Sequence, residues 1–105
     1  MARWAPRLPV KTLTVHRIGG HLAARVQADF GVTAPTALAA PLVAADEWHP
    51  IPRIDVPVQF ENIEYYLVLT QMAAYPSSTF GRTLGNLLSF ETEISNALDR
   101  LFWGF

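Results

Sequence analysis

The chain has 105 residues, of which half are hydrophobic and only 16% are charged. This composition suits one compact domain and excludes an intrinsically disordered chain, which needs low hydrophobicity and high net charge. The formal net charge of -1, from 8 basic and 9 acidic residues, provides no overall basic surplus for binding nucleic acid.

The chain contains no cysteine, which excludes disulfides, thiolate catalysis and zinc–thiolate sites. This fits the reducing cytosol, and we expect a cytoplasmic location. No apolar run approaches the roughly 20 residues of a membrane span. The first residues also lack the long apolar stretch of a signal peptide, so we expect no membrane partner.

The first residues do not show the pattern of a regular element. Residues 1–9 carry two prolines and two arginines around Trp4, and proline fixes φ and removes a backbone donor. We expect an irregular arm here. The whole chain, residues 1–105, is expected to form a single domain.

Two strands and a turn are expected next. Alternating and β-branched residues over 10–17 predict one strand, and similar alternation over 22–30 predicts a second. Gly19-Gly20 interrupts the pattern and predicts a turn. The two strands are therefore expected to form a β-hairpin.

Prolines punctuate the middle of the chain. Pro35 and Pro41 argue against a continuous helix over the alanine-rich residues 33–45. We expect instead a short strand over 38–43, with Pro41 at a sheet edge or a bulge.

Two further strands, joined by a turn, follow the proline-rich loop. Over residues 54–60 one face is apolar, and it is formed by Ile54, Val56, Val58 and Phe60. Pro57 then lies on the other face, at a sheet edge. Glu61-Asn62 predicts the turn, and the near-continuous apolar run over 63–73 predicts a strand buried on both faces.

The last part of the chain ends in a helix. A turn is expected over 74–78, and a short helical turn within 79–88. Ser89 is expected to act as the N-cap of the C-terminal helix. Glu91 and Glu93 then lie in the first turn, where the helix dipole favours acidic side chains.

This helix has one apolar face. Its stripe consists of Phe90, Ile94, Ala97, Leu98, Leu101 and Phe102. At about 100° per residue, Trp103 falls roughly opposite the centre of the stripe, on the face of Thr92, Asn96 and Asp99. If the helix reaches Trp103, its indole is exposed and suits a protein contact, because tryptophan is enriched among interface hot spots. The alternative is a helix that ends earlier, with Trp103 folded into the core.

No catalytic or metal-binding pattern stands out. His16, His21 and His49 lack metal-ligand spacing, so we expect neither a metal nor a cofactor. Asp46-Glu47 beside His49 combines acid and base groups, but its place before two prolines indicates a solvated loop. No phosphate-binding glycine motif is present, and the residues themselves do not predict an enzyme.

The ending over residues 96–105, NALDRLFWGF, resembles that of the CcdB family of bacterial toxins. VQAD at 26–29, Pro-Leu at 41–42 and QMAAYP at 71–76 resemble further segments of that family, in the same order and at similar spacing. The resemblance covers about residues 10–105. Its most specific mark is the terminal Phe-Trp-Gly followed by an apolar residue.

The resemblance implies a mainly β (α+β) fold: an SH3-like β barrel with a small additional sheet and one C-terminal α-helix, assembled as a twofold homodimer. It implies a toxin of a type II toxin–antitoxin system, of the kind that serves plasmid maintenance, and not an enzyme. Such toxins bind the A subunit of DNA gyrase and trap the gyrase–DNA cleavage complex. A cognate antitoxin neutralises them, and direct recognition of nucleic acid is not implied.

The resemblance also implies which residues contact gyrase. They are Trp103, Gly104 and Phe105 at the terminus, Thr92, Asn96 and Asp99 on the helix, and Phe30 in an early strand.

Two positions depart from the family pattern. Asp99 stands where the best-known toxin of the family has asparagine, and Gly31 stands where that toxin has an apolar residue. These departures favour a second hypothesis, a non-toxic relative that binds only the antitoxin. A third hypothesis is an endoribonuclease of the MazF type, a toxin family that shares the barrel. It requires a basic groove and positioned acid and base groups.

Overall fold

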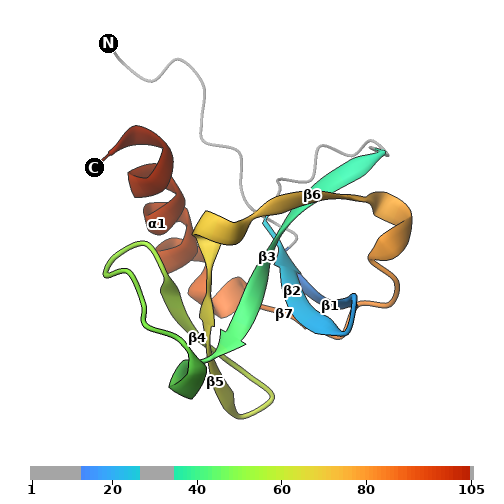
Figure 1. Ribbon diagram of the computed structural model, residues 1–105, viewed down its shortest axis with the longest axis horizontal. Coiled ribbons are helices and arrows are strands. Elements are labelled where there is room, and N and C mark those ends of the chain that lie inside the picture. Colours follow the sequence, from blue (N-terminus) through green and yellow to red (C-terminus); the bar gives the residue numbers. More distant parts are fainter. Residues whose placement is uncertain (1–12, 27–34, 105) are drawn as a thin grey trace.

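The computed structural model describes residues 13–26 and 35–104. Within these ranges the strands are β1 (Thr14–Ile18), β2 (His21–Arg25), β3 (Thr36–Ala44), β4 (Val56–Phe60), β5 (Ile63–Leu67), β6 (Ala73–Pro76) and β7 (Gly85–Asn86). The helix α1 (Glu91–Trp103) follows them (Figure 1). Short 3-10 turns are η1 (Ala45–Glu47), η2 (Leu69–Gln71), η3 (Ser77–Thr79) and η4 (Leu88–Phe90). The arm expected over residues 1–9 lies outside the described residues.

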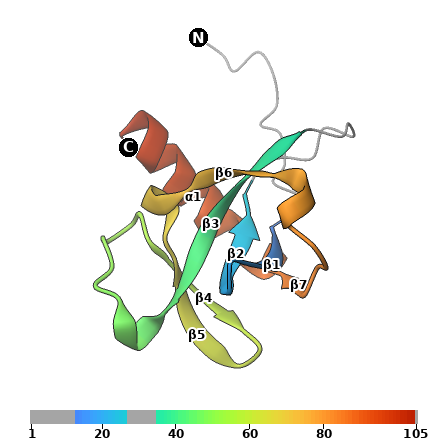
Figure 2. The ribbon, with the colours of Figure 1, turned by 45° about the vertical axis from the view of Figure 1, so that its right-hand side comes forward.

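The strands form one antiparallel sheet in the order β4-β5-β3-β2-β1-β7, with β6 also paired to β3. The long strand β3 has β2 on one side, and β5 and then β6 on the other. Its last residues join the small sheet of β4 and β5 to the curled sheet of β1, β2, β6 and β7, as Figures 1 and 2 show. The predicted SH3-like barrel with a small additional sheet and a C-terminal helix is confirmed.

Both predicted hairpins are present. β1 pairs with β2 across Gly19-Gly20, which have φ of 59° and 84°. β4 pairs with β5 across Glu61-Asn62, which have φ of 52° and 66°. A two-residue turn with positive φ at both positions matches the right-handed twist of the flanking strands.

The alternation predicted over 54–60 is confirmed from Val56 onward, whereas Ile54 lies before β4 and is only partly buried. Val56, Val58 and Phe60 are buried, while Pro57 is exposed on the edge strand of the sheet. Proline is tolerated there because an edge strand leaves one row of backbone groups without a ladder partner.

The prediction of one doubly buried strand over 63–73 is wrong. β5 ends at Leu67, and its first residue, Ile63, is 52% exposed. The backbone N–H of Val68 then donates to the carbonyl of Pro41 at 3.0 Å, η2 follows, and β6 resumes the pairing along β3. The apolar run reflects a chain that turns across the core, because Leu67, Val68 and Leu69 are all fully buried.

The next two segments also differ from the prediction, because each pairs with a strand that is distant in the sequence. Residues 74–76 belong to β6 and not to a turn. Residues 79–88 hold the short strand β7 in place of a helical turn, because this segment pairs with β1 at Val15↔Gly85. Local sequence does not record such a pairing with a distant strand.

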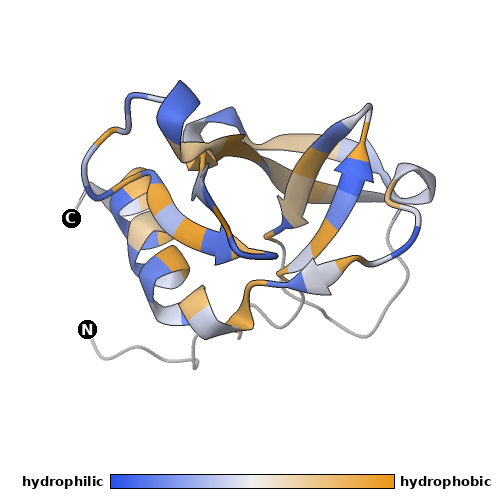
Figure 3. Ribbon diagram, turned by 90° about the horizontal axis from the view of Figure 1, so that it is seen from below, coloured by the Kyte–Doolittle hydropathy of each residue, from blue (hydrophilic) through white to orange (hydrophobic). Residues whose placement is uncertain are grey.

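The C-terminal helix packs its apolar stripe on the core. Ile94 and Ala97 are buried beside core residues from β1, β2, β3, β4 and β5, and Leu98 and Leu101 are partly buried against them. Figure 3 shows hydrophobic and hydrophilic residues mixed along α1, as expected for a helix with one buried face.

The start of α1 corrects one prediction. Ser89 is not the N-cap, since it lies in η4 and the cap position is Phe90, without a side-chain hydrogen bond. Phe90 instead donates its backbone N–H to the carbonyl of Leu87 at 2.9 Å, which continues the chain smoothly from the 3-10 turn into the helix. Glu91 and Glu93 occupy the first turn as predicted. None of the helices in the described ranges has the length and apolar character to span a bilayer.

Candidate partner-binding face of the C-terminal helix

The helix α1 extends to Trp103, whose side chain is 71% exposed. The alternative of an early helix end with a buried indole is therefore wrong. The next residue, Gly104, adopts a left-handed conformation (φ 76°, ψ 17°) and donates its N–H to the carbonyl of Arg100 at 2.8 Å. A glycine in this conformation closes the helix without a Cβ penalty.

The structure brings four of the predicted contact residues onto one face of α1. Thr92, Asn96 and Trp103 are exposed, and Asp99 is partly buried. Their spacing of four, three and four residues places them on one side of a helix, away from the buried Ile94. The predicted positions Phe30 and Phe105, and the departure at Gly31, lie outside the described residues.

Phe102 corrects the predicted core stripe, because its side chain is 64% exposed. On the helical wheel it sits at the edge of the stripe, about 120° from Phe90, whereas Leu101 stays partly buried against the core. Phe102 and Trp103 together form an exposed pair that we call the aromatic end of α1. The position of Phe102 at the edge of the apolar stripe could have indicated its exposure from the sequence alone.

Charges along α1 follow the helix dipole. Glu91 and Glu93 lie in the first turn and Arg100 lies in the last, where each sign is favoured. The guanidinium of Arg100 also donates to the backbone carbonyl of Arg53 at 2.9 Å. This bond joins the end of the helix to the loop that precedes β4.

That loop contains a buried carboxylate that the sequence did not single out. Asp55 is 4% exposed, and its Oδ2 accepts hydrogen bonds from the indole Nε1–H of Trp48 at 2.7 Å and from the backbone N–H of Ile51 at 2.8 Å. No motif marks Asp55, because its two donors are assembled by the fold of the loop.

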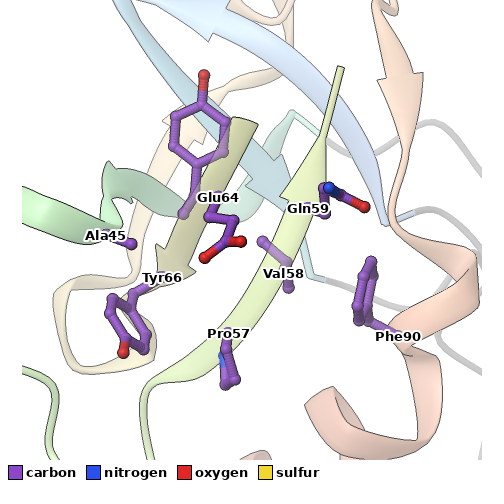
Figure 4. Close-up of a pocket in the computed structure, with 8 residues that line it drawn as sticks. Ala45, Pro57, Val58, Gln59, Glu64, Tyr66 and Phe90 are labelled. Atoms are coloured by element: carbon purple, nitrogen blue, oxygen red, sulfur yellow. The ribbon is translucent and has the colours of Figure 1, made fainter. Parts of the chain in front are cut away.

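A cavity of about 290 Å³ lies between the small sheet and the start of α1 (Figure 4). Its lining residues are Ala45, Pro57, Val58, Gln59, Glu64, Tyr65, Tyr66 and Phe90. Glu64 supplies the one carboxylate in this set and Tyr65 and Tyr66 supply the hydroxyls, while the described lining holds no serine, cysteine, lysine or histidine.

A larger groove of about 690 Å³ runs from the β1–β2 hairpin to η1. Its described lining mixes apolar side chains with polar ones, and the charged or titratable members are Arg17, His21, Glu47, Tyr65 and Tyr75. Among the described residues of this lining the two formal charges balance, so they do not form the basic groove that an endoribonuclease needs for phosphates. Asp46 and His49 are exposed, which confirms the predicted solvated loop.

His16 is an ordinary strand histidine, as predicted. It is 5% exposed, and its Nδ1 lies 3.2 Å from the carbonyl of Arg82 and its Nε2 lies 2.8 Å from the hydroxyl of Thr14. A carbonyl only accepts, so Nδ1 carries the proton. Across residues 13–26 and 35–104, no three His, Cys, Asp or Glu side chains gather in a metal-binding arrangement.

Comparison with known proteins gives one result. A family model described as CcdB protein matches residues 18–104, most of the chain, including the helix face and the aromatic end. A comparison with curated proteins finds no match.

Proposed function

Because the chain belongs to the CcdB family, we propose that it is the toxin of a type II toxin–antitoxin system. It binds the A subunit of DNA gyrase and traps the gyrase–DNA cleavage complex. It does so as a homodimeric, non-enzymatic inhibitor in the cytoplasm, and a cognate antitoxin neutralises it.

The exposed indole of Trp103 is the observation that carries this proposal. Trp103 lies 71% exposed on a face whose other members, Thr92 and Asn96, are polar. Phe102 beside it is also exposed, and contiguous exposed apolar side chains are typical of a binding surface. Tryptophan is prominent among interface hot spots. In this family such a residue at the end of the last helix is expected to contact gyrase.

The chemistry of that contact follows from symmetry. A twofold dimer presents two copies of each aromatic end. Where the copies lie close to the axis, their rings make one patch that receives a cation of a symmetric partner by cation–π contact. Phe102, at 64% exposure, widens the patch. Gly104 leaves room for close backbone approach, and Asp99, Phe105 and Phe30 complete the proposed contact.

A second candidate function rests on Asp99. This residue adds a negative charge to the face, where the best-known toxin of the family has a neutral asparagine. A charge on a contact face must lose water when a complex forms, which opposes binding. A non-toxic relative would then bind the antitoxin but not gyrase, whereas degradation of RNA by the purified protein would favour the endoribonuclease instead.

Growth of bacteria that express the chain tests the proposal. The wild-type chain is expected to stop growth and to retain the gyrase A subunit in a pull-down. Trp103→Ala should restore growth and weaken gyrase binding by about 30-fold, as for a hot spot of roughly 2 kcal/mol. Asp46→Ala, at an exposed position in η1, serves as the matched control and should remain toxic. Equal growth of cells with wild type and with Trp103→Ala, without gyrase retention, would refute the proposal.

A further inference from the structure

The loop between η1 and β4 is closed on itself around Asp55. The Oδ2 atom of Asp55 accepts from the side chain of Trp48 and from the backbone of Ile51. The carbonyl of Ile51 in turn accepts the N–H groups of Ile54 and Asp55 at 3.1 and 3.0 Å. Because Asp55 is buried, these bonds are shielded from water and fix the loop more firmly than exposed ones would.

This closed loop holds Arg53 in an unusual backbone conformation. Its φ is 69°, in the left-handed region that residues with a Cβ rarely adopt. The surrounding turn from Ile51 to Asp55 supports the conformation. The carbonyl of Arg53 is then placed to accept the guanidinium of Arg100 at 2.9 Å. Figures 1 and 2 both show the loop beside α1.

Arg100 ties this loop to the end of the helix. Its side chain binds Arg53, and its backbone carbonyl accepts the N–H of Gly104. Trp103 lies between these two attachments along the chain and is 71% exposed, so packing contributes little to holding it. Leu101 packs the inner side of the last turn against the core, and on its exposed side the bond from Arg100 to Arg53 is a further contact that orients it.

A cavity between the loop and the helix makes this bond more important. It has a volume of about 220 Å³, with Asp55 and Pro57 on one wall and Asn96, Ala97 and Arg100 on the other. Side chains do not interdigitate across this space as they do in a packed core. Val56 and Ala97, which also line this space, join its two walls in the core, and the bond from Arg100 to Arg53 is a second link between them.

We propose that the loop over residues 48–55 is a brace that positions the last turn of α1. Asp55 and Arg100 are its positioning residues. Asp55 closes the loop by its hydrogen bond with Trp48, and Arg100 attaches the closed loop to the helical turn that ends at Trp103. The value of this positioning for gyrase binding rests on the proposed function, while the brace itself does not. An ordered helix end loses less freedom when a partner binds.

Amide hydrogen exchange of Gly104 tests the brace without any partner. Arg100→Met keeps the aliphatic stem and a good helix former but removes the guanidinium. It should speed the exchange of the Gly104 amide by about threefold, as expected for loss of one exposed charged hydrogen bond. Trp48→Phe keeps an aromatic ring but removes the indole donor, together with part of the ring, far along the chain from α1. It should speed the exchange of the same amide. The Val68 amide, bonded to Pro41 in the core, reports any global loss of stability.

The double variant supplies the decisive comparison. If Trp48 acts through Arg100, Trp48→Phe should have little further effect once Arg100→Met is present. Arg17→Met is the matched control, since it removes a similar exposed bond, from Arg17 to the carbonyl of Gly20 at 3.3 Å, and should leave the Gly104 amide unchanged. Unchanged exchange in Trp48→Phe, or effects that simply multiply in the double variant, would overturn the brace.

Gyrase binding then separates the two proposals. With wild-type binding present, Trp48→Phe should weaken it in proportion to the exchange effect, although Trp48 lies outside the contact face. Absence of wild-type binding would refute the proposed function and leave the exchange test of the brace intact.

Discussion

A methyl group at Gly85 is predicted to disturb the core through Phe60. A Cβ built at this position lies 2.7 Å from Cε1 and 3.1 Å from Cζ of the Phe60 ring, whereas ordinary contacts begin at 3.4 Å. The ring must therefore retreat by about 0.7 Å, although it is 6% exposed and packed in the core. Overpacking of this kind costs about 1–3 kcal/mol, and replacing glycine returns about 0.4–1 kcal/mol through the unfolded state.

Gly85→Ala should thus destabilise the fold by about 1–2 kcal/mol and lower the midpoint of thermal unfolding by about 5–15 °C. Phe60→Leu shortens the side chain at the point of conflict, so a double-mutant cycle should show favourable coupling of at least about 0.5 kcal/mol. The measurement is thermal unfolding of the four proteins, followed by circular dichroism. A Gly85→Ala variant as stable as wild type, or strict additivity in the cycle, would refute the assigned packing of β7 against β4.

Two further predictions concern stability. Ile94 is fully buried on α1, so Ile94→Ala should lower the free energy of unfolding in urea by about 2–5 kcal/mol. Thr92→Ala, at an exposed position of the same helix, is the control and should change it by no more than about 0.5 kcal/mol. A loss under about 1 kcal/mol for Ile94→Ala would contradict the packing of the helix. Glu61 is exposed and has a φ of 52°, a conformation that asparagine adopts more readily. Glu61→Asn should therefore raise the midpoint of urea unfolding by an amount equivalent to about 0.5 kcal/mol. A lower midpoint would contradict the geometry of this turn.

Sequence periodicity predicted the elements that have one buried face and one solvent-exposed face. β4 was found because Val56, Val58 and Phe60 alternate with exposed residues, and α1 because its buried residues recur at helical spacing. The run Leu67-Val68-Leu69 failed for a physical reason. Continuous apolarity reports burial, but it does not tell a strand from a chain that turns across a core. The short strand β7 was not predicted, because it forms by pairing with Val15, which is distant in the sequence.

The candidate site shows the same division. The wheel placed Trp103 on the polar face correctly, because the angle between residues of a helix is fixed by its geometry. It assigned Phe102 to the core, since a wheel does not show where the covering surface ends. The bonds from Trp48 to Asp55 and from Arg100 to Arg53 depend on a loop conformation, which no local pattern encodes.

The most direct test of the central claim is a cleavage assay with purified components. Gyrase, supercoiled DNA and ATP are incubated with the wild-type chain or with Trp103→Ala, and trapped complexes are converted to linear DNA by denaturant and protease. We expect linear DNA to accumulate with increasing wild-type protein, and about 30-fold more of the Trp103→Ala variant to be needed for the same yield. Equal yields from both proteins, or no linear DNA at saturating wild-type protein, would contradict the assignment of the aromatic end of α1 as the surface that poisons gyrase.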